Sequence, residues 1–175
     1  MHRPERTARN LSPRSHDGNP VTLHTNPAAF AADLPARGSL LALDLSPARL
    51  GFAGTDAARS LVTPLRTLQR RRLAADLEAV IALAASREAA GLVVGWPLNM
   101  DGSAGRACDQ VRSFLGELRR HLALPVLLQD ERLTTAAVEQ AIGDGLYPRR
   151  RRGEPVDDLA AAVILEDALR AMRQA

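Results

Sequence analysis

Short apolar runs alternate with longer, helically periodic segments through most of this chain. Apolar residues fill Leu40–Leu43, Leu92–Val94 and Val126–Leu128, and runs of this length predict buried strands. Two more short strands are predicted at Arg49–Gly54 and Leu61–Leu65, because turn residues separate these segments. The first three strands follow one another directly along the chain, which favours an antiparallel meander.

Helical spacing recurs between and after the later strands. Apolar residues repeat on one helix face in Leu73–Ala84 and again in Val111–Leu118. Two later helices are predicted at Thr134–Gly143, where Thr134 is a suitable N-cap, and at Val156–Met172. The element order βββαβαβαα predicts an α/β fold. Its five-stranded mixed sheet would have three antiparallel strands, then two parallel ones, with helices on its faces.

The polar N-terminus contrasts with this pattern. Residues 1–26 contain scattered Pro, Asn, Ser and Gly, and this composition predicts a disordered tail. Pro27–Leu34 could form one short helix that docks on the domain through Phe30 and Leu34. We therefore divide the 175 residues into an extension, 1–38, and a single domain, 39–175.

Composition narrows the classes of protein. Cys108 is the single cysteine, which excludes an internal disulfide and a cysteine-rich zinc site. No apolar run reaches the 18 residues that a membrane span needs, and the N-terminus lacks the apolar stretch of a signal peptide. We expect a soluble cytoplasmic protein without membrane contact, acting as a monomer or weak homodimer.

The basic residues are more informative than the net charge of +3. All 23 are arginine and none is lysine, and the arginine fork suits phosphate, although genome composition explains the absence of lysine equally well. Arg149–Arg152 form a run in a loop rich in turn residues, where they could contact backbone phosphates or simply be solvated. Aromatic residues make up only 3%, so base stacking on aromatic platforms is not expected.

Three acidic residues on separate segments carry the candidate chemistry. Asp44 and Glu131 follow apolar strands, and Asp157 opens the last predicted helix. In mixed sheets of this kind, ligands bind at the carboxyl ends of the central strands. Carboxylates converging there would suit Mg²⁺, which takes hard oxygen ligands together with substrate phosphates. The pattern therefore points to phosphoester chemistry.

Each acid also has a plainer interpretation. Asp44 precedes Leu-Ser-Pro and could cap a tight turn. Glu131 could form a surface ion pair with Arg132, which contributes little to stability. Asp157 could interact with the helix dipole, worth roughly 0.3–1 kcal/mol. Only their joint placement in the predicted topology favours a site.

Four segments of the chain together resemble a known family. The strings LLALDLSPARLGFA, VVGWPLNMDGSAG, VLLQDERLTT and VDDLAAAVILEDAL occur in this order. They resemble the YqgF family, bacterial proteins described as Holliday-junction-resolvase-like or as pre-16S rRNA nucleases, with an RNase H-like fold. The resemblance covers about Ser39–Met172 and none of the tail.

The resemblance implies a metal-dependent phosphodiesterase acting on nucleic acid. The family's three acidic positions correspond to Asp44, Glu131 and Asp157, which would be both catalytic residues and ligands of Mg²⁺ (or Mn²⁺). The expected activity is endonucleolytic processing of the 5′ end of pre-16S rRNA, with the ribosome as a candidate partner. Nucleic-acid contacts are expected from Arg49, Asn99, Arg132, Arg149, Arg150, Arg151 and Arg152.

One departure from the family pattern bears on the site. Ser46 stands where the family usually has glycine after Asp-x. If that position required a positive φ, Ser46 would be strained, or the turn would differ.

Two other functions remain open from the sequence. The chain could resolve Holliday junctions in branched DNA, or it could be an RNA- or ribosome-associated factor without turnover, although all three acids are present. An actin-like sugar kinase or ATPase also has a phosphate loop after a strand, but it needs two such domains and this chain has length for one.

Overall fold

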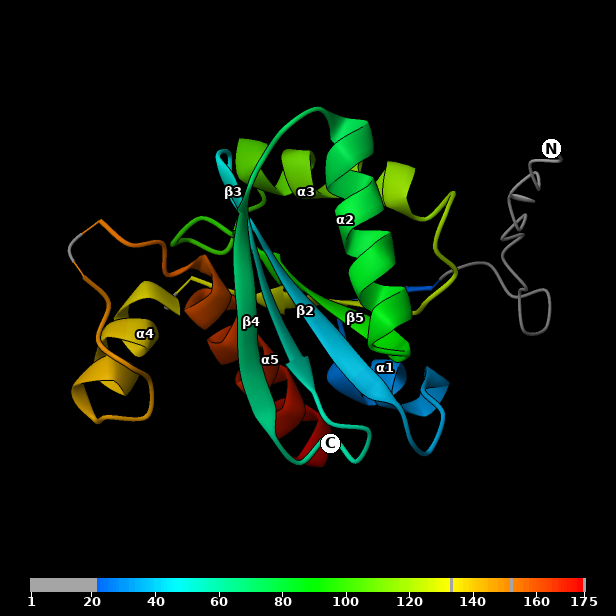
Figure 1. Ribbon diagram of the computed structural model, residues 1–175. Helices are drawn as coiled ribbons and strands as arrows, with labels where there is room; N and C mark the ends of the chain where they lie inside the picture. Colours follow the sequence, from blue (N-terminus) through cyan, green and yellow to red (C-terminus); the bar gives the residue numbers. More distant parts are fainter. Residues whose placement is uncertain (1–21, 133, 152, 175) are drawn as a thin grey trace, which may run out of the picture.

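A computed structural model describes residues 22–132, 134–151 and 153–174 of the protein. It shows one mixed sheet with helices on both faces (Figure 1). The strands are β1 (Leu23–His24), β2 (Ser39–Leu45), β3 (Arg49–Thr55), β4 (Val62–Gln69), β5 (Ala89–Trp96) and β6 (Val126–Asp130). The helices are α1 (Pro27–Asp33), α2 (Leu73–Ser86), α3 (Arg106–Leu118), α4 (Thr134–Gly143) and α5 (Asp157–Gln174).

The sheet has the strand order β1-β6-β5-β2-β3-β4. β2, β3 and β4 form the predicted antiparallel meander, while β5 runs parallel to β2 and β6 parallel to β5. This confirms the mixed sheet and its five predicted strands. The strand count of five is wrong, because the short β1 adds a sixth strand parallel to β6.

Residues 22–26 belong to the folded part of the protein. His24 on β1 is buried, its Nε2 lies 2.8 Å from Asp33 Oδ2, and its ring packs edge-on against Phe30. Phe30 and Leu34 are buried against the domain, as predicted. The expectation of a disordered tail over 1–26 is therefore wrong for these residues, and residues 1–21 lie outside the described chain.

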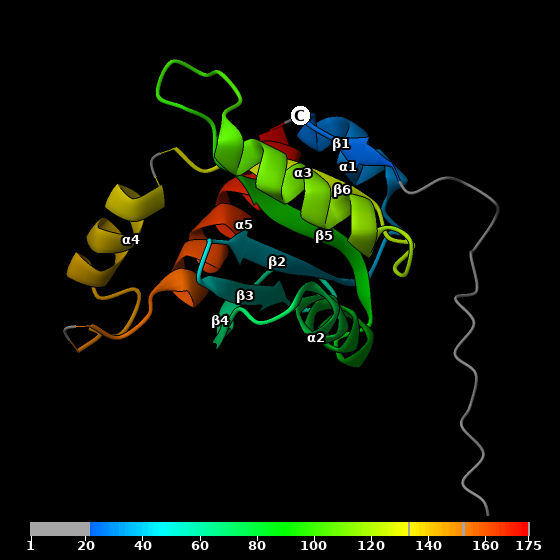
Figure 2. The same cartoon turned by 90° about the horizontal axis from the view of Figure 1, so that it is seen from above.

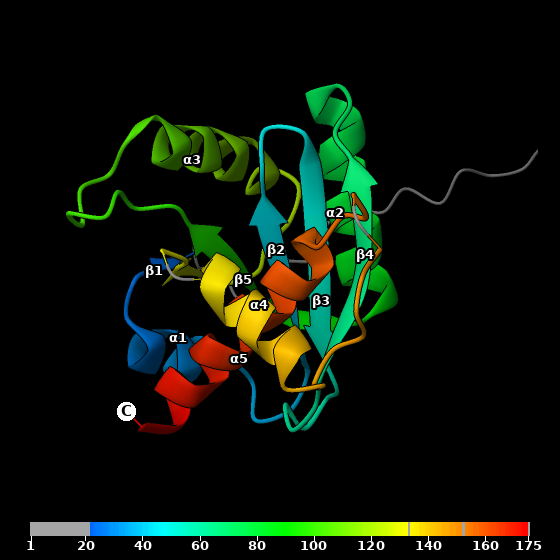
Figure 3. The ribbon, with the colours of Figure 1, turned by 90° about the vertical axis from the view of Figure 1, so that its left-hand side faces the viewer.

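Strand alternation sends apolar side chains to two separate cores. Leu41, Leu43 and Val94 pack under α2 and α3, and Ala42 and Val93 pack under α1 and α5. Figure 2 shows the sheet between these two helix layers, and Figure 3 shows α4 and α5 together on one side of it. α4 rests on α5 through a small apolar cluster. No helix in the described part of the chain has the length and apolar character needed to cross a membrane.

The start of α5 lies unusually close to β3. A Cβ at Gly51 would overlap the backbone carbonyl of Asp157, so only glycine allows the helix N-terminus to lie at this depth. Because β3 pairs with β2 through Gly51 and Asp44, this close approach also sets the distance between α5 and the end of β2.

Replacing Gly51 should therefore destabilise the fold. We expect Gly51→Ala to lower the free energy of unfolding by about 2 kcal/mol, because backbone must move to admit the methyl group. Gly116→Ala is the matched control: this exposed helical glycine of α3 has free space around it, and alanine there should stabilise by about 0.5–1 kcal/mol. Urea unfolding measures both. An unchanged midpoint for Gly51→Ala would show that α5 does not depend on this contact.

Candidate active site

Asp44 lies near the carboxyl end of β2, on the sheet face covered by α5. Because Asp44 lies two residues after Ala42 in β2, its side chain points to the same face of the sheet, and Ala42 belongs to the core under α5. The pKa of Asp44 is raised to about 6, mainly by burial and also by the charge of Asp157, while Arg49 opposes the shift. A carboxyl group that merely capped a turn would be stabilised in its charged form by amide hydrogen bonds. The raised pKa therefore favours a site over a structural cap.

Glu131 follows β6 and lies over β5 toward Asp44. Its carboxylate occupies the space above Gly95, where any Cβ would overlap Oε2. Oε2 is buried and has no hydrogen-bond partner within the described residues. The pKa of Glu131 is raised to about 8, mainly by burial and also by the charges of Asp44 and Asp130. The surface pair with Arg132 is not formed, since Arg132 binds Asp130 instead.

Asp157 is the first residue of α5 and is buried. Its Oδ2 accepts a hydrogen bond from Arg49 Nε at 2.7 Å. Arg49, at the start of β3, therefore binds a carboxylate of the site in this structure. Asp44 interacts electrostatically with both Glu131 and Asp157, so the structure brings it within charge–charge reach of each of the other two acids.

The carboxylate oxygens of these residues are suitable ligands for a divalent cation, but their positions in this structure are too far apart to hold one. Mg²⁺ and Mn²⁺ favour carboxylate oxygens, and the unpartnered Glu131 Oε2 is an oxygen in need of a positive partner. Within residues 22–132, 134–151 and 153–174, however, no three His, Cys, Asp or Glu residues lie close enough to hold a metal ion. A bound cation would therefore have to draw the carboxylates closer together.

Ser46 forms the turn between β2 and β3 without strain. Its Oγ accepts a hydrogen bond from the backbone N–H of Arg49 at 2.9 Å, and its own N–H donates to the Arg49 carbonyl at 3.0 Å. The non-glycine residues with positive φ among those described are Arg59 and Glu88. The serine at this position, where the family usually has glycine, thus closes the turn with its own hydrogen bonds and leaves Asp44 near the end of β2.

The arginine run divides into different environments. Arg150 donates from its terminal nitrogen to Asp158 Oδ2 at 2.7 Å, while Arg149 and Arg151 have exposed side chains. Asp158 is buried and is also joined to Thr67 of β4. Arg152 lies outside the described residues. Arg150 therefore anchors the basic loop to the sheet beside Asp157.

Asn99 closes the loop between β5 and α3 on itself. Its side-chain nitrogen donates to Ser103 Oγ at 2.8 Å, and its carbonyl accepts from Gly102 N–H at 2.8 Å. This loop projects from the same side of the molecule as α4 (Figure 2). Asn99 therefore shapes a projecting loop and is not joined to the three acids.

Sequence reasoning missed several residues that hold the site together. Gly95 makes room for Glu131, Thr67 and Asp158 fix the start of α5, and Asp130 binds Arg132. Gly95 ends an apolar run, which could have suggested a close approach. Nothing in the sequence marks Thr67.

A mixed sheet of this order, with carboxylates at the ends of β2 and β6 and at the start of α5, defines an RNase H-like nuclease. The sequence model of the RuvX (YqgF) family, described as "Holliday junction resolvase", matches residues 38–171. The chain belongs to this family, which confirms the resemblance, and it is a hydrolytic nuclease.

Close relatives carry a related name. A protein of Ruegeria pomeroyi is 42% identical over 144 residues, covering 82% of this chain and 94% of the relative. A protein of Sphingopyxis alaskensis is 47% identical over 143 residues, covering 82% and 93%. Both are named "Putative pre-16S rRNA nuclease".

A solved structure supports the fold independently of sequence. RuvC of T. thermophilus in complex with a Holliday junction substrate superposes with a TM-score of 0.51 at 10% identity, covering 77% of this chain and 96% of that one. At this level of identity the likeness concerns the fold, and it agrees with the RNase H-like architecture predicted from sequence.

The raised pKa values predict an unusual pH dependence of stability in EDTA. A carboxyl group whose pKa is higher in the folded state holds its proton longer there, so stability falls as pH rises between the unfolded and folded values. For Glu131 this window runs from 4.5 to about 8. We expect Glu131→Gln to gain about 2–4 kcal/mol over the wild type between pH 5 and pH 8.

Urea unfolding across this range measures the difference. Glu78→Gln is the control, because Glu78 is an exposed glutamate of α2, and its pH profile should follow the wild type. A constant difference between Glu131→Gln and the wild type at every pH would show that Glu131 ionises normally.

Proposed function

We propose that this protein is a metal-dependent endonuclease that matures the 5′ end of pre-16S rRNA in the cytoplasm. The observation that carries the proposal is the pairing of Asp44 with Glu131. These two carboxyl groups have raised pKa values, the charge of Asp44 contributes to the raised pKa of Glu131, and Glu131 Oε2 has no hydrogen-bond partner within the described residues. Such an arrangement stores repulsion that a divalent cation bound with a phosphate-bearing substrate would relieve.

Asp44, Glu131 and Asp157 would hold the metal, Mg²⁺ or Mn²⁺. A bound divalent ion supplies charge stabilisation for a phosphoryl group and makes water a better nucleophile. The protein's own part is to present ionised carboxylates. Glu131 holds a proton near neutral pH, so cation binding and loss of the Glu131 proton are linked. Arg49 pairs with Asp157 and fixes the orientation of its carboxylate.

RNA is favoured over DNA by the names of the relatives, which describe pre-16S rRNA nucleases. The family description and the fold neighbour instead concern Holliday junctions. The carboxylate geometry serves phosphodiester hydrolysis in either polymer, so branched DNA is the alternative substrate and the two must be compared directly.

Cleavage assays test this function. Labelled pre-16S rRNA 5′-leader fragments and a four-way DNA junction would be incubated with Mg²⁺, Mn²⁺ or EDTA. We expect metal-dependent cutting of the RNA by the wild type. The neutral variants Asp44→Asn, Glu131→Gln and Asp157→Asn should lose about 10²-fold or more in rate, because each removes a charge from the site.

Glu78→Gln is the matched control and should cut at the wild-type rate. Exclusive cutting of the junction would identify a resolvase. If the wild type bound RNA without cutting it, and the three variants bound equally well, the site would not be catalytic and the protein would be a binding factor.

The basic loop supplies a second part of the proposal. Arg149 and Arg151 are exposed beside the anchored Arg150. Free guanidinium groups near a phosphodiester site can bind backbone phosphates, whereas the Arg150 group is already engaged with a buried carboxylate. We therefore assign phosphate binding to Arg149 and Arg151, and we assign to Arg150 the role of holding the loop in place.

Two neighbouring substitutions distinguish these roles. Arg149→Ala should leave stability within about 0.5 kcal/mol of the wild type, and should reduce the slope of log affinity against log salt by about 1. Arg150→Ala should instead lower the free energy of unfolding by about 2 kcal/mol, because Asp158 stays buried without its partner.

Urea unfolding and salt titration of RNA binding measure the two effects. The assignment would be reversed if Arg150→Ala had the stability of the wild type and reduced the salt dependence of RNA binding more than Arg149→Ala does. Arg150 would then be the phosphate-binding residue.

A further inference from the structure

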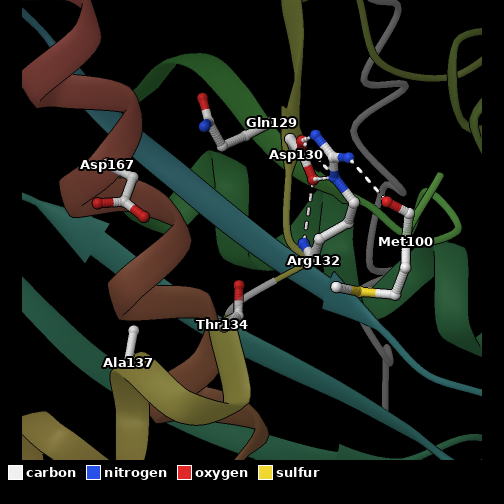
Figure 4. Close-up of a pocket in the computed structure, with 7 residues that line it drawn as sticks. All are labelled: Met100, Gln129, Asp130, Arg132, Thr134, Ala137 and Asp167. Atoms are coloured by element: carbon white, nitrogen blue, oxygen red, sulfur yellow. Dashed lines mark hydrogen bonds and ion pairs between the residues drawn. The ribbon is translucent and has the colours of Figure 1, made fainter. Parts of the chain in front are cut away.

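A pocket of about 480 Å³ opens beside the carboxylates, between the end of β6, the loop after β5, α4 and α5 (Figure 4). This volume lies within the range of about 300–1,000 Å³ for small-molecule sites. None of the three site carboxylates lines it. The lining residues are Met100, Gln129, Asp130, Arg132, Thr134, Ala137 and Asp167.

The pocket adjoins the site through the chain itself. Asp130 and Arg132 flank Glu131, and Gln129 pairs in the sheet with Gly95, over which Glu131 lies. Glu131 turns inward over Gly95, while its sequence neighbours Asp130 and Arg132 line the pocket. A polynucleotide whose phosphodiester reached Glu131 would therefore bring an adjacent nucleotide to the pocket.

Arg132 presents the flat face of its guanidinium group. Nε and one terminal nitrogen donate to Asp130 at 2.7–3.1 Å, and the other terminal nitrogen donates to the Met100 carbonyl at 3.4 Å. These hydrogen bonds occupy the edge that would otherwise grip a phosphate. Guanidinium planes also stack on nucleobases, and the Arg132 side chain remains 34% exposed. Arg132 is one of the residues expected to contact nucleic acid, and stacking on a base is a contact that its hydrogen-bonded guanidinium group can still make.

The opposite part of the pocket offers hydrogen-bond acceptors. Asp167 of α5 pairs through Oδ1 with Arg170 at 3.1 Å, and no partner within the described residues occupies Oδ2. The Gln129 amide and Thr134 hydroxyl likewise have no hydrogen-bond partner among those residues. Met100, which is 74% exposed, adds an apolar wall. Figure 4 shows Asp167 on one side of the pocket and Met100 on the other.

We propose that this pocket binds the base of one unpaired nucleotide next to the phosphodiester that the enzyme cleaves, and selects bases with an exocyclic amino group. The base stacks on Arg132, and its amino group donates to Asp167. This rests on the proposed nuclease function. It also names a feature of the substrate: the nucleotide beside the cleaved bond must be free to leave a duplex.

The charges in the pocket favour a hydrogen-bond donor over a phosphate. Each of its two carboxylates, Asp130 and Asp167, is paired with an arginine, so neither arginine offers an uncompensated charge to an anion. An ionised carboxylate can only accept hydrogen bonds. Adenine, cytosine and guanine each have an exocyclic amino group with two N–H donors. Uracil lacks this group and has only the single donor N3–H on its Watson–Crick edge.

Binding is tested first, with catalysis abolished. The Asp44→Asn protein would be titrated with short single-stranded RNAs that carry 2-aminopurine at successive positions. We expect one position to change fluorescence strongly on binding, and its replacement by uracil to weaken binding about tenfold. Adding Ala137→Phe should abolish the fluorescence change by filling the pocket. Ala136→Phe, on an exposed position of the same helix, should not.

A second pair of variants tests the amino-group contact. Asp167→Asn should bind the uracil and 2-aminopurine RNAs with affinities within about twofold of each other, because an amide can also donate to uracil. Asp109→Asn is the control, since Asp109 forms the equivalent i,i+3 pair with Arg112 on α3, outside this pocket. It should keep the tenfold preference.

The outcomes separate this proposal from the nuclease function. Equal fluorescence at every position, or a preference for amino-bearing bases that persists in Asp167→Asn, would overturn the base pocket whether or not the wild type cuts RNA. A position-specific signal lost in Ala137→Phe would support the pocket even if no cleavage were found. In that case the cleavage function alone would fail.

Discussion

Repulsion among buried carboxylates is the constraint on which the rest of this structure depends. Asp44 is half-buried and lies within electrostatic reach of both Glu131 and Asp157. Like charges in such a place cannot all remain ionised without a cation. The protein compensates in two ways: Asp157 pairs with Arg49, while Asp44 and Glu131 have raised pKa values. The repulsion that remains between Asp44 and Glu131 is the basis of the metal-binding role proposed for these carboxylates.

Backbone packing holds these groups together against their repulsion. Gly51 and Gly95 each occupy a point where a methyl group would overlap part of an acidic residue, but the two overlaps differ in kind. At Gly51 the overlapping atom belongs to the backbone of α5, which cannot yield without moving a helix. At Gly95 it is the tip of the Glu131 side chain, which could turn away. The first glycine therefore supports the fold, and the second supports the orientation of a single carboxylate.

The periodic elements and the three acids could be predicted because each leaves a local signal. Apolar runs identified five strands, and the placement of Asp44, Glu131 and Asp157 at element ends predicted their convergence. β1 was missed because two residues, Leu23 and His24, are too few to show a period. The four arginines could not be told apart, since nothing local distinguishes Arg150 from Arg149. The difference arises in the folded protein, where Asp158 pairs with Arg150 while Arg149 remains exposed.

The segment Asp130-Glu131-Arg132 shows how three adjacent charges can serve two purposes. An arginine beside Glu131 would be expected to lower its pKa. Arg132 instead binds Asp130, whose pKa is held below its usual value mainly by that hydrogen bonding, while Asp130 adds its own repulsion to Glu131. Because Asp130 and Arg132 pair with each other, Arg132 does not pair with Glu131, and Glu131 Oε2 has no hydrogen-bond partner within the described residues. The same pairing engages donors of the Arg132 guanidinium group at the wall of the neighbouring pocket, so the arrangement that leaves Glu131 Oε2 unpartnered within the described residues also shapes the pocket.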